Sequence, residues 1–323
     1  MKILVCGAGG FIGNSLVKFL KKEDNYLVGV DLKSPRYQNS DADDFYNLDL
    51  RNFDSAKHVL NLHNYDEIYQ LAADMGGAGF VFTGENDADI MHNSASINLN
   101  ILNELSNQKF KGTIFYSSSA CMYPEYNQMD PDNPKCSEDS AYPAAPDSEY
   151  GWEKLFSERI YLAFSRNKNL NVRIARYHNI FGPLGSWNDG REKAPAAICR
   201  KIAMAKEKDT IEIWGNGKQT RSFLFIDDCI NATVNLTRSS HIGPFNIGSE
   251  EKISIRDLVK LVSEIANKVI GIKSIEGPIG VAGRTSDNKQ INHALKWTPE
   301  ISLKEGLTKT YNWISDEINK QNS

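Results

Sequence analysis

Ser119, Tyr150 and Lys154 are residues of types that can move a proton, and their surroundings bring them together. Ser119 follows residues 112–116, a β-branched and aromatic run that predicts a buried strand. Tyr150 and Lys154 lie four residues apart at a predicted helix start, so their side chains share one face. A phenol ionises near pH 10, about three units too high for a base at neutrality, unless an ammonium group favours its anion. The three side chains could take a proton from a hydroxyl whose carbon loses hydride.

A fourth reactive side chain, Cys121, comes two residues after Ser119. The commonest role of a free cysteine after a strand is that of a small buried residue. Open α/β sheets, however, bind ligands at the carboxyl ends of their strands. The position of Cys121 at such an end favours a chemical role over simple packing.

The start of the chain carries a dinucleotide-binding pattern. Residues 2–6 are a short apolar run, and three glycines follow before a helix predicted to extend to about Lys22. A strand, a glycine turn and a helix in this order let the backbone approach a pyrophosphate at the helix N-terminus. The residues predicted to contact the cofactor here are Gly7, Gly10, Phe11, Ile12 and Gly13.

A second predicted strand, residues 26–31, ends in Asp31. A carboxylate at this distance accepts hydrogen bonds from a ribose 2′-hydroxyl and repels a 2′-phosphate, which favours NAD over NADP. Lys33 and Arg36 lie close enough to keep NADP open. Three more residues could contact the dinucleotide, although packing is their commoner role: Asp49, Leu50 and Ala72.

Strand and helix patterns alternate from the N-terminus to residue 177 and loosen afterwards. This alternation predicts an α/β protein: a doubly wound parallel Rossmann sheet with a smaller C-terminal substrate-binding lobe. We assign residues 1–177 and about 223–250 to the NAD-binding domain, and about 178–222 with 251–323 to the lobe.

Composition limits the remaining classes of function. The chain has 37 basic and 41 acidic residues, which leaves no electrostatic footprint for nucleic acid. It has no apolar run of the roughly 18 residues that a membrane span needs, and its start leaves no room for a signal peptide. Five scattered cysteines show no metal-binding spacing. We therefore expect a reduced, cytoplasmic protein without a metal.

These motifs together resemble the extended short-chain dehydrogenase/reductase family over nearly the whole chain. They are, in order, Gly7-x-x-Gly10-x-x-Gly13, Ser119, Tyr150-x-x-x-Lys154, Arg176-x-x-Asn179-x-x-Gly182-Pro183 and Asn246-Ile247-Gly248. Within that family, a second set resembles the GDP-mannose 3,5-epimerases and is mostly lacking in ordinary four-position epimerases. This second set comprises residues 72–77, 118–125, 190–197, 219–223 and 283–288.

The resemblance implies a role for each matching residue. Tyr150 would be the hydroxyl base, Lys154 its modulator and a contact of the nicotinamide ribose, and Ser119 would steady the substrate hydroxyl. Cys121 and Lys193 would be the acid/base pair of the epimerisation. The residues implied to bind the substrate, several of which could on their own be surface residues, are Gly79, Ser119, Cys121, Asn179, Glu192, Lys193, Lys201, Gln219, Arg221 and Arg284.

The implied activity is NAD-dependent epimerisation of a nucleoside-diphosphate sugar, with a GDP-sugar favoured and a homodimer formed through predicted helices 88–108 and 149–166. Ala78 stands where the family has Met, so a related GDP-sugar such as a GDP-heptose stays open. A plain C4 epimerase would leave Cys121 and Lys193 idle. A 4,6-dehydratase would carry Asp-Glu in place of Ala120 and Cys121, and a non-catalytic NAD sensor would tend to lose Tyr150 or Lys154.

Overall fold

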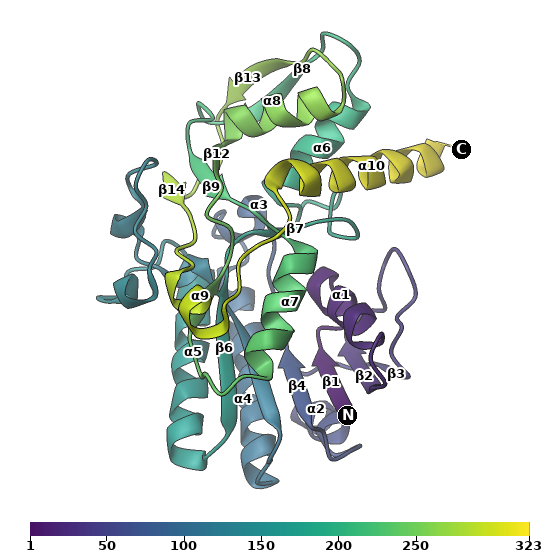
Figure 1. The fold of residues 1–323 in the computed structure, drawn as a ribbon, viewed down its shortest axis with the longest axis vertical. Coiled ribbons are helices and arrows are strands. Elements are labelled where there is room, and N and C mark those ends of the chain that lie inside the picture. The colour runs from purple at the N-terminus through teal and green to yellow at the C-terminus, as the bar shows by residue number, and fades with distance from the viewer. Residues whose placement is uncertain (323) are drawn as a thin grey trace.

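A seven-stranded parallel sheet forms the lower half of the molecule in the computed structural model, which describes residues 1–322 (Figure 1). The strand order β11-β6-β5-β4-β1-β2-β3 places β1 inside the sheet, with later strands added on both sides. The predicted doubly wound parallel sheet is thus confirmed. Its strands are β1 (Lys2–Cys6), β2 (Tyr26–Asp31), β3 (Asp44–Asn47), β4 (Glu67–Gln70), β5 (Thr113–Ser119), β6 (Asn171–Tyr177) and β11 (Phe245–Ile247).

Helices cover both faces of this sheet, as the side chains of β1 show. Ile3 and Val5 join one hydrophobic core, whereas Leu4 and Cys6 join the other, because successive side chains of a strand point to opposite faces. The first core includes α1 (Phe11–Leu20) and α7 (Ile226–Thr237), and the second includes α2 (Phe53–Leu60), α4 (Asp87–Asn107) and α5 (Glu149–Lys168). Within residues 1–322, no helix is both long and apolar enough to cross a membrane.

An upper lobe stands above the carboxyl ends of the strands (Figure 1). We define it as α6 (Ala194–Met204), β8 (Thr210–Trp214), α8 (Ile255–Ile265), β13 (Gly271–Ile275) and α10 (Leu303–Asn322). Strands β8 and β13 pair in parallel within it. Since α7 and β11 return to the main sheet between α6 and α8, the upper lobe is built from segments that are separated along the chain.

Short elements connect the sheet to the upper lobe. The pair β7 (Ile180–Phe181) and β10 (Leu224–Phe225) is parallel, and β9 (Thr220–Ser222) lies between β12 (Lys252–Ser254) and β14 (Gly283–Arg284). The four-residue helix α3 (Ala78–Val81) follows β4. Helix α9 (Lys289–Leu295) packs against β11 of the main sheet, although the sequence assigned its residues to the lobe.

A long polar segment, residues 127–147, connects the end of β5 to α5 and is held by hydrogen bonds to the sheet. It contains the second half of η2 (Glu125–Gln128) and all of η3 (Glu138–Ala141), and η1 (Ala120–Met122) precedes it. Arg176 of β6 forms a buried ion pair of 2.7 Å with Glu158 of α5 and donates to the Tyr123 hydroxyl and the Glu138 carbonyl. Asn246 accepts from Tyr123 and donates its backbone N–H to the Glu138 carboxylate. The chain is therefore fixed to the central sheet just before this segment, at Tyr123, and near its middle, at Glu138.

Glu158→Ala should destabilise the protein by about 3–5 kcal/mol, because it leaves the Arg176 guanidinium buried without its carboxylate partner. Urea unfolding followed by circular dichroism measures this change. As a control, Glu305→Ala removes the exposed partner of Lys309 on α10 and should change the unfolding free energy by less than about 1 kcal/mol. Equal effects of the two substitutions would contradict the anchoring role of the buried pair.

Candidate active site

The end of β5 and the start of α5 meet at the carboxyl edge of the sheet. Strand β5 continues through Ser119, beyond the predicted strand, and η1 then carries Cys121. Ser148 caps α5 by accepting from the N–H of Gly151 at 3.3 Å. A Cβ on Gly151 would lie 2.2 Å from the Cys121 carbonyl oxygen, so only glycine allows this close approach. The approach sets Tyr150 beside Cys121 and Ser119.

Tyr150 is buried against Val81, Ile90 and Cys121. Burial raises the pKa of the Tyr150 phenol well above its ordinary value; Cys121 raises it further, whereas a hydrogen bond with Ser119 and the charge of Arg284 lower it. The sequence predicts that a neighbouring ammonium group lowers the pKa of the phenol. The Lys154 Nζ lies 5.7 Å from the Tyr150 ring centre and donates to the Ser117 carbonyl at 3.1 Å. In the structure, Arg284 is the cation that favours the phenolate.

Cys121 is the centre of the site. Its thiol lies 3.0 Å from Nη1 of Arg284, a buried residue of β14. Burial lowers the pKa of Lys154, and the nearby Glu153 and Cys121 oppose that shift. The electrostatic neighbours of Cys121 are Tyr150, Lys154, Lys193, Arg221 and Arg284. Most of the predicted catalytic residues therefore lie near Cys121.

Lys193 reaches the site from the start of α6, on a loop that is fastened to the segment after β4. The Gly77 N–H donates to the Arg191 carbonyl at 2.9 Å, and a Cβ on Gly77 would meet the Glu192 carbonyl. The Arg191 guanidinium donates to Asp74 at 3.2 Å and stacks on Phe80 at 4.0 Å. Burial lowers the pKa of Lys193, while Cys121 and Cys229 raise it.

Two arginines occupy adjacent strands above Cys121. Arg221 of β9 is the register partner of Arg284 of β14. Burial and the like charge of Arg284 lower the pKa of Arg221 to about 10, so it stays cationic at neutral pH. Within residues 1–322, its side chain donates to the carbonyls of Thr220 and Ile279. A pair of guanidinium groups suits a dianionic diphosphate.

The remaining predicted substrate residues lie around this cluster and bond to their own surroundings. Asn179 donates to the Ser222 carbonyl at 3.0 Å, and Gln219 donates to the Trp214 carbonyl at 3.1 Å. Glu192 pairs with Arg200 at 2.9 Å. Lys201 donates to the Glu212 carbonyl between α6 and β8, rather than to a member of the cluster around Cys121.

Three further residues of this region are not indicated by the sequence motifs. Trp214 is exposed and borders Gly79, whose Cβ would lie 3.4 Å from the indole. Gln128 and Asp147 both contact Arg284. The only signal for these two was their position in an unusually long loop after a ligand-binding edge.

The glycine turn forms a cradle at the start of α1. Gly7 has a φ of +84°, and a Cβ on it would lie 2.8 Å from the Ala72 backbone nitrogen. A Cβ on Gly13 would lie 2.0 Å from the Gly7 carbonyl oxygen. Gly10 begins the helix without a side-chain cap, so the first N–H groups, which include those of Phe11 and Ile12, lack an intrahelical partner. These features fit a pyrophosphate.

The carboxylate of Asp31 accepts hydrogen bonds from the N–H groups of Gly9 and Lys33 at 3.0 and 3.2 Å, next to this cradle. Burial raises the pKa of Asp31, and these N–H groups oppose the shift. Arg36 pairs with Asp189 at 3.3 Å and stacks on the Tyr37 ring, so it is turned to other partners. Two other residues that could contact the dinucleotide, Asp49 and Leu50, lie near the end of β3. Asp49 pairs with Arg51 at 2.7 Å, and Leu50 is buried.

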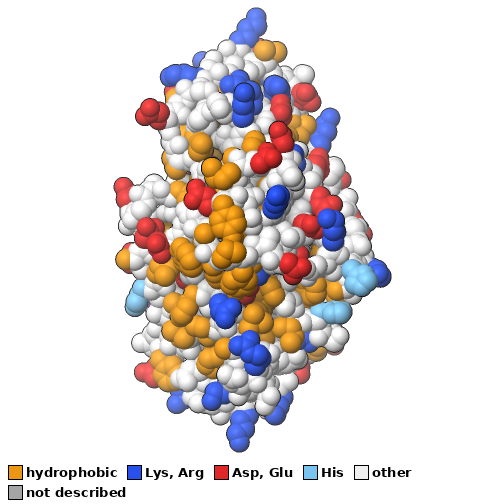
Figure 2. Space-filling model, turned by 90° about the vertical axis from the view of Figure 1, so that its left-hand side faces the viewer, with side chains coloured by type: hydrophobic (Ala, Val, Ile, Leu, Met, Phe, Trp, Pro, Cys, Tyr) orange, Lys and Arg blue, Asp and Glu red, His pale blue; other side chains and the backbone are white. Residues whose placement is uncertain are grey.

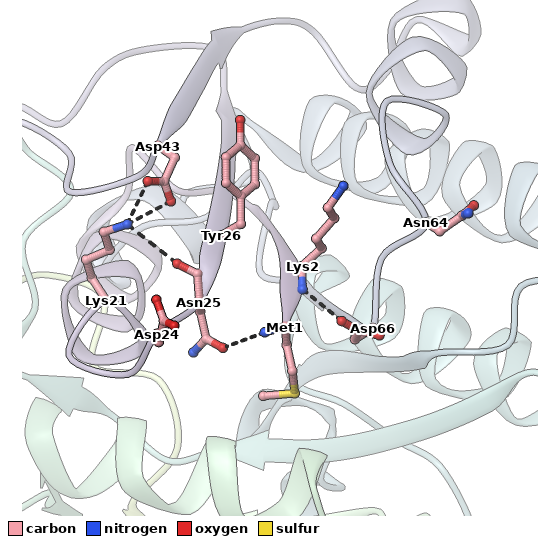
Figure 3. A pocket seen from close by; sticks show the side chains of 9 residues that line it. All are labelled: Met1, Lys2, Lys21, Asp24, Asn25, Tyr26, Asp43, Asn64 and Asp66. Carbon is pink, nitrogen blue, oxygen red and sulfur yellow. Dashed lines mark hydrogen bonds and ion pairs between the residues drawn. The ribbon is translucent and has the colours of Figure 1, made fainter.

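A separate open hollow lies at the amino ends of β1 and β2, at the opposite edge of the sheet (Figure 3). Within it, Lys21 pairs with Asp43 at 2.7 Å, and the carboxylate of Asp66 accepts from the backbone N–H of Lys2 at 2.8 Å. None of the predicted site residues lines it. Among residues 1–322, no group of three or more His, Cys, Asp or Glu side chains could hold a metal ion.

Comparison with known proteins identifies the family of this chain. Residues 3–248 match the model of the NAD dependent epimerase/dehydratase family. The GDP-mannose 3,5-epimerase of Arabidopsis thaliana is 41% identical over 323 residues, which cover 99% of this chain and 84% of that protein.

Two solved structures have the same fold over 98% of this chain and 100% of their own. The UDP-glucose 4-epimerase of Thermotoga maritima with UDP-glucose has a TM-score of 0.86 at 25% identity. The UDP-glucuronic acid 4-epimerase of Bacillus cereus with UDP-glucuronic acid and NAD has a TM-score of 0.82 at 27% identity. The resemblance found in the sequence is confirmed: this chain belongs to the NAD-dependent epimerase/dehydratase family.

Proposed function

We propose that this protein is an NAD-dependent 3,5-epimerase of a nucleoside-diphosphate hexose, GDP-mannose or a close relative. One observation carries the proposal: Cys121 packs beside Tyr150 and is an electrostatic neighbour of Lys193, although Lys193 is far from both in the sequence. A relative 41% identical over 99% of the chain is a GDP-mannose 3,5-epimerase, which supports the reaction and the substrate.

NAD supplies the hydride acceptor and donor for C4 of the sugar. The residues that would hold it are those of the glycine cradle, together with Asp31, Asp49, Leu50, Ala72, Tyr150 and Lys154. Tyr150 would take the proton of the C4 hydroxyl and later return it. Ser119, within hydrogen-bonding reach of Tyr150, would hold that hydroxyl in line. Lys154 donates to the Ser117 carbonyl and thereby also fixes the end of β5.

Inversion of a carbon requires a base on one face of the ring and a proton donor on the other. While C4 is a carbonyl, the hydrogens on C3 and C5 are acidic enough to exchange. Cys121 approaches the site from the sheet, whereas Lys193 approaches from the start of α6. Burial lowers the pKa of Lys193, which suits an amine that must both gain and lose a proton near neutrality.

The diphosphate would bind between Arg221 and Arg284. Trp214 and Gln219 lie at the outer side of this pair and would contact the nucleotide. Ala78, where the family has Met, lies beside Gly79 and would leave room for a larger substituent on the sugar. A GDP-heptose is therefore the related substrate to test beside GDP-mannose.

Plain C4 epimerisation is the second candidate, because the two solved structures described above are C4 epimerases of UDP-sugars. That reaction needs no acid or base beyond Tyr150, so it gives no role to the Cys121 and Lys193 pair. The intact Tyr150 and Lys154 disfavour a non-catalytic NAD sensor. The five free thiols suit a reducing compartment, and we propose that the protein works in the cytoplasm.

Incubation with GDP-mannose in heavy water should place deuterium at C3 and C5, as observed by NMR. Cys121→Ala should retain bound NAD but reduce this uptake by about 10²–10⁴-fold, the usual contribution of a general acid or base. Cys199→Ala, which removes a buried thiol of α6, is the matched control and should exchange like the wild type. Appearance of a C4 epimer without deuterium would establish the second candidate instead.

Asp31→Ala should weaken NAD binding by about tenfold or more, because it removes a carboxylate that would accept hydrogen bonds from the ribose. The variant should also lose its discrimination against NADP, since the carboxylate no longer repels the 2′-phosphate. Titration of NAD-depleted protein, followed by nucleotide fluorescence, measures both affinities. Asp54→Ala removes an exposed acid of α2 and should change neither; an unchanged NAD affinity in Asp31→Ala would refute the assignment.

An apolar groove runs between the outer faces of α4 and α5. Met91, Ala95, Trp152 and Phe156 line it, and Leu99 lies exposed nearby on α4. Figure 2, which views the molecule from the side of α5, shows hydrophobic side chains gathered on the lower part of this face. We propose that a second copy of the chain covers it, because the same two long helices from each copy would form a self-complementary bundle.

The double variant Trp152→Glu/Phe156→Glu should convert the wild-type dimer to a 36.2 kDa monomer, because it buries two carboxylates at the interface. Sedimentation equilibrium measures the mass at micromolar concentration. Met204→Glu, at an exposed methionine of α6, adds a carboxylate elsewhere and should stay dimeric. A monomeric wild type, or a dimeric double variant, would exclude this interface.

A further inference from the structure

The guanidinium of Arg284 contacts Cys121, and two other side chains fix its position. Each of its three nitrogens donates to a different side chain: Nε to Oε1 of Gln128, Nη1 to the sulfur of Cys121 at 3.0 Å, and Nη2 to Oδ2 of Asp147 at 3.2 Å. Since the guanidinium is a rigid plane, hydrogen bonds that fix two of its nitrogens also fix the direction of the third. Gln128 and Asp147 therefore aim Nη1 at the sulfur.

Both supports are themselves fixed. Gln128 is fully buried, and its amide nitrogen donates to the carbonyls of Tyr123 and Pro124, each at 3.1 Å, so that Oε1 faces Arg284. The side chains of Asp147 and Arg284 are each only 5% exposed, so water does not compete for their ion pair. Asp147 immediately precedes Ser148, the cap of α5, and thus links the guanidinium to the helix that carries Tyr150.

The contact favours one protonation state of Cys121. A neutral thiol is a weak acceptor, whereas a guanidinium beside a thiolate forms a charge-assisted hydrogen bond and stabilises the anion. Burial lowers the pKa of Arg284, but Cys121 and Asp147 outweigh burial and raise it, so the cation persists. Only the thiolate can act as a base.

We propose that Asp147 is a positioning residue which, through Arg284, keeps Cys121 as a thiolate ready to accept a proton from the sugar. This inference rests on the acid/base role proposed for Cys121. In the step it serves, the C–H bond breaks, the proton passes to the sulfur, and a proton from the Lys193 ammonium joins the opposite face of the same carbon. Exchange with solvent then returns the thiol and the amine to their starting states.

The alternative is that Asp147 acts only as a nearby negative charge, and the two possibilities predict opposite signs. A carboxylate near a sulfur disfavours the thiolate, so its removal would favour the anion. If Asp147 instead holds Arg284 in place, its removal releases the guanidinium and disfavours the anion. The sign of the change in thiolate formation therefore separates positioning from plain charge.

The experiment measures alkylation of Cys121 by iodoacetamide from pH 5.5 to 9.5, with NAD bound and no sugar, by mass spectrometry of the Cys121 peptide. The other four cysteines are buried, which limits competing reaction. Asp147→Ala should shift the midpoint of the pH–rate curve upward by about one unit. Arg284→Met should shift it at least as far. The control, Asp132→Ala, removes an acid of the same loop whose side chain is 91% exposed and should leave the midpoint unchanged.

The double variant Asp147→Ala/Arg284→Met decides whether Asp147 acts through Arg284. Its midpoint should equal that of Arg284→Met alone. A midpoint of Asp147→Ala that is unchanged or lowered, or a further upward shift in the double variant, would overturn the proposal. If Asp147→Ala does not fold, Gln128→Met removes the other support and should raise the midpoint in the same way. Because alkylation needs no sugar, this result is independent of whether GDP-mannose is turned over.

Discussion

The ion pair between Arg176 and Glu158 fixes the geometry on which the site depends. Both side chains are 2% exposed, and an ion pair buried to that degree contributes little net stability, because desolvation offsets the attraction. Its structural effect is larger. Arg176 also donates to Tyr123 and to the Glu138 carbonyl, so a shift of the segment between β5 and α5 would leave part of the buried guanidinium without hydrogen-bond acceptors. The pair specifies one position for the segment that carries Gln128 and Asp147.

The reactive side chains extend into the site from two different parts of the fold. Cys121 and Tyr150 belong to the rigid side, where Gly151 lets α5 touch the backbone of η1. Lys193 and Arg284 belong to segments that join the sheet to the upper lobe. The loop of Lys193 is tied back to the segment after β4 by the Gly77 N–H and by Arg191. A base and a proton donor on opposite faces of a ring require such an arrangement, because one rigid element presents its side chains mainly from one direction.

Local patterns in the sequence were enough to predict the sheet, the glycine cradle and the shared face of Tyr150 and Lys154, because each depends on residues close in the chain. The partners of Cys121 were not predictable in this way. Arg284 lies 163 positions from Cys121, and the two meet only because β14 pairs with β9 above the sheet. The resemblance to known epimerases named Arg284 as a diphosphate ligand, but it could not show that Asp147 and Gln128 already occupy two of its nitrogens. The position of α9 beside β11 likewise depends on tertiary packing that no local pattern encodes.

The pairing of Arg284 with Asp147 also gives Arg284 and Arg221 different roles. Asp147 balances the charge of Arg284, whose attraction is then directed at the sulfur. The hydrogen bonds of Arg221, by contrast, go to the neutral carbonyls of Thr220 and Ile279, so its positive charge is left without a carboxylate partner among the described residues. A diphosphate bound beside both arginines would draw its charge balance mainly from Arg221. The substrate could then bind without pulling Arg284 away from the Cys121 sulfur, because the diphosphate would rely on a different cation.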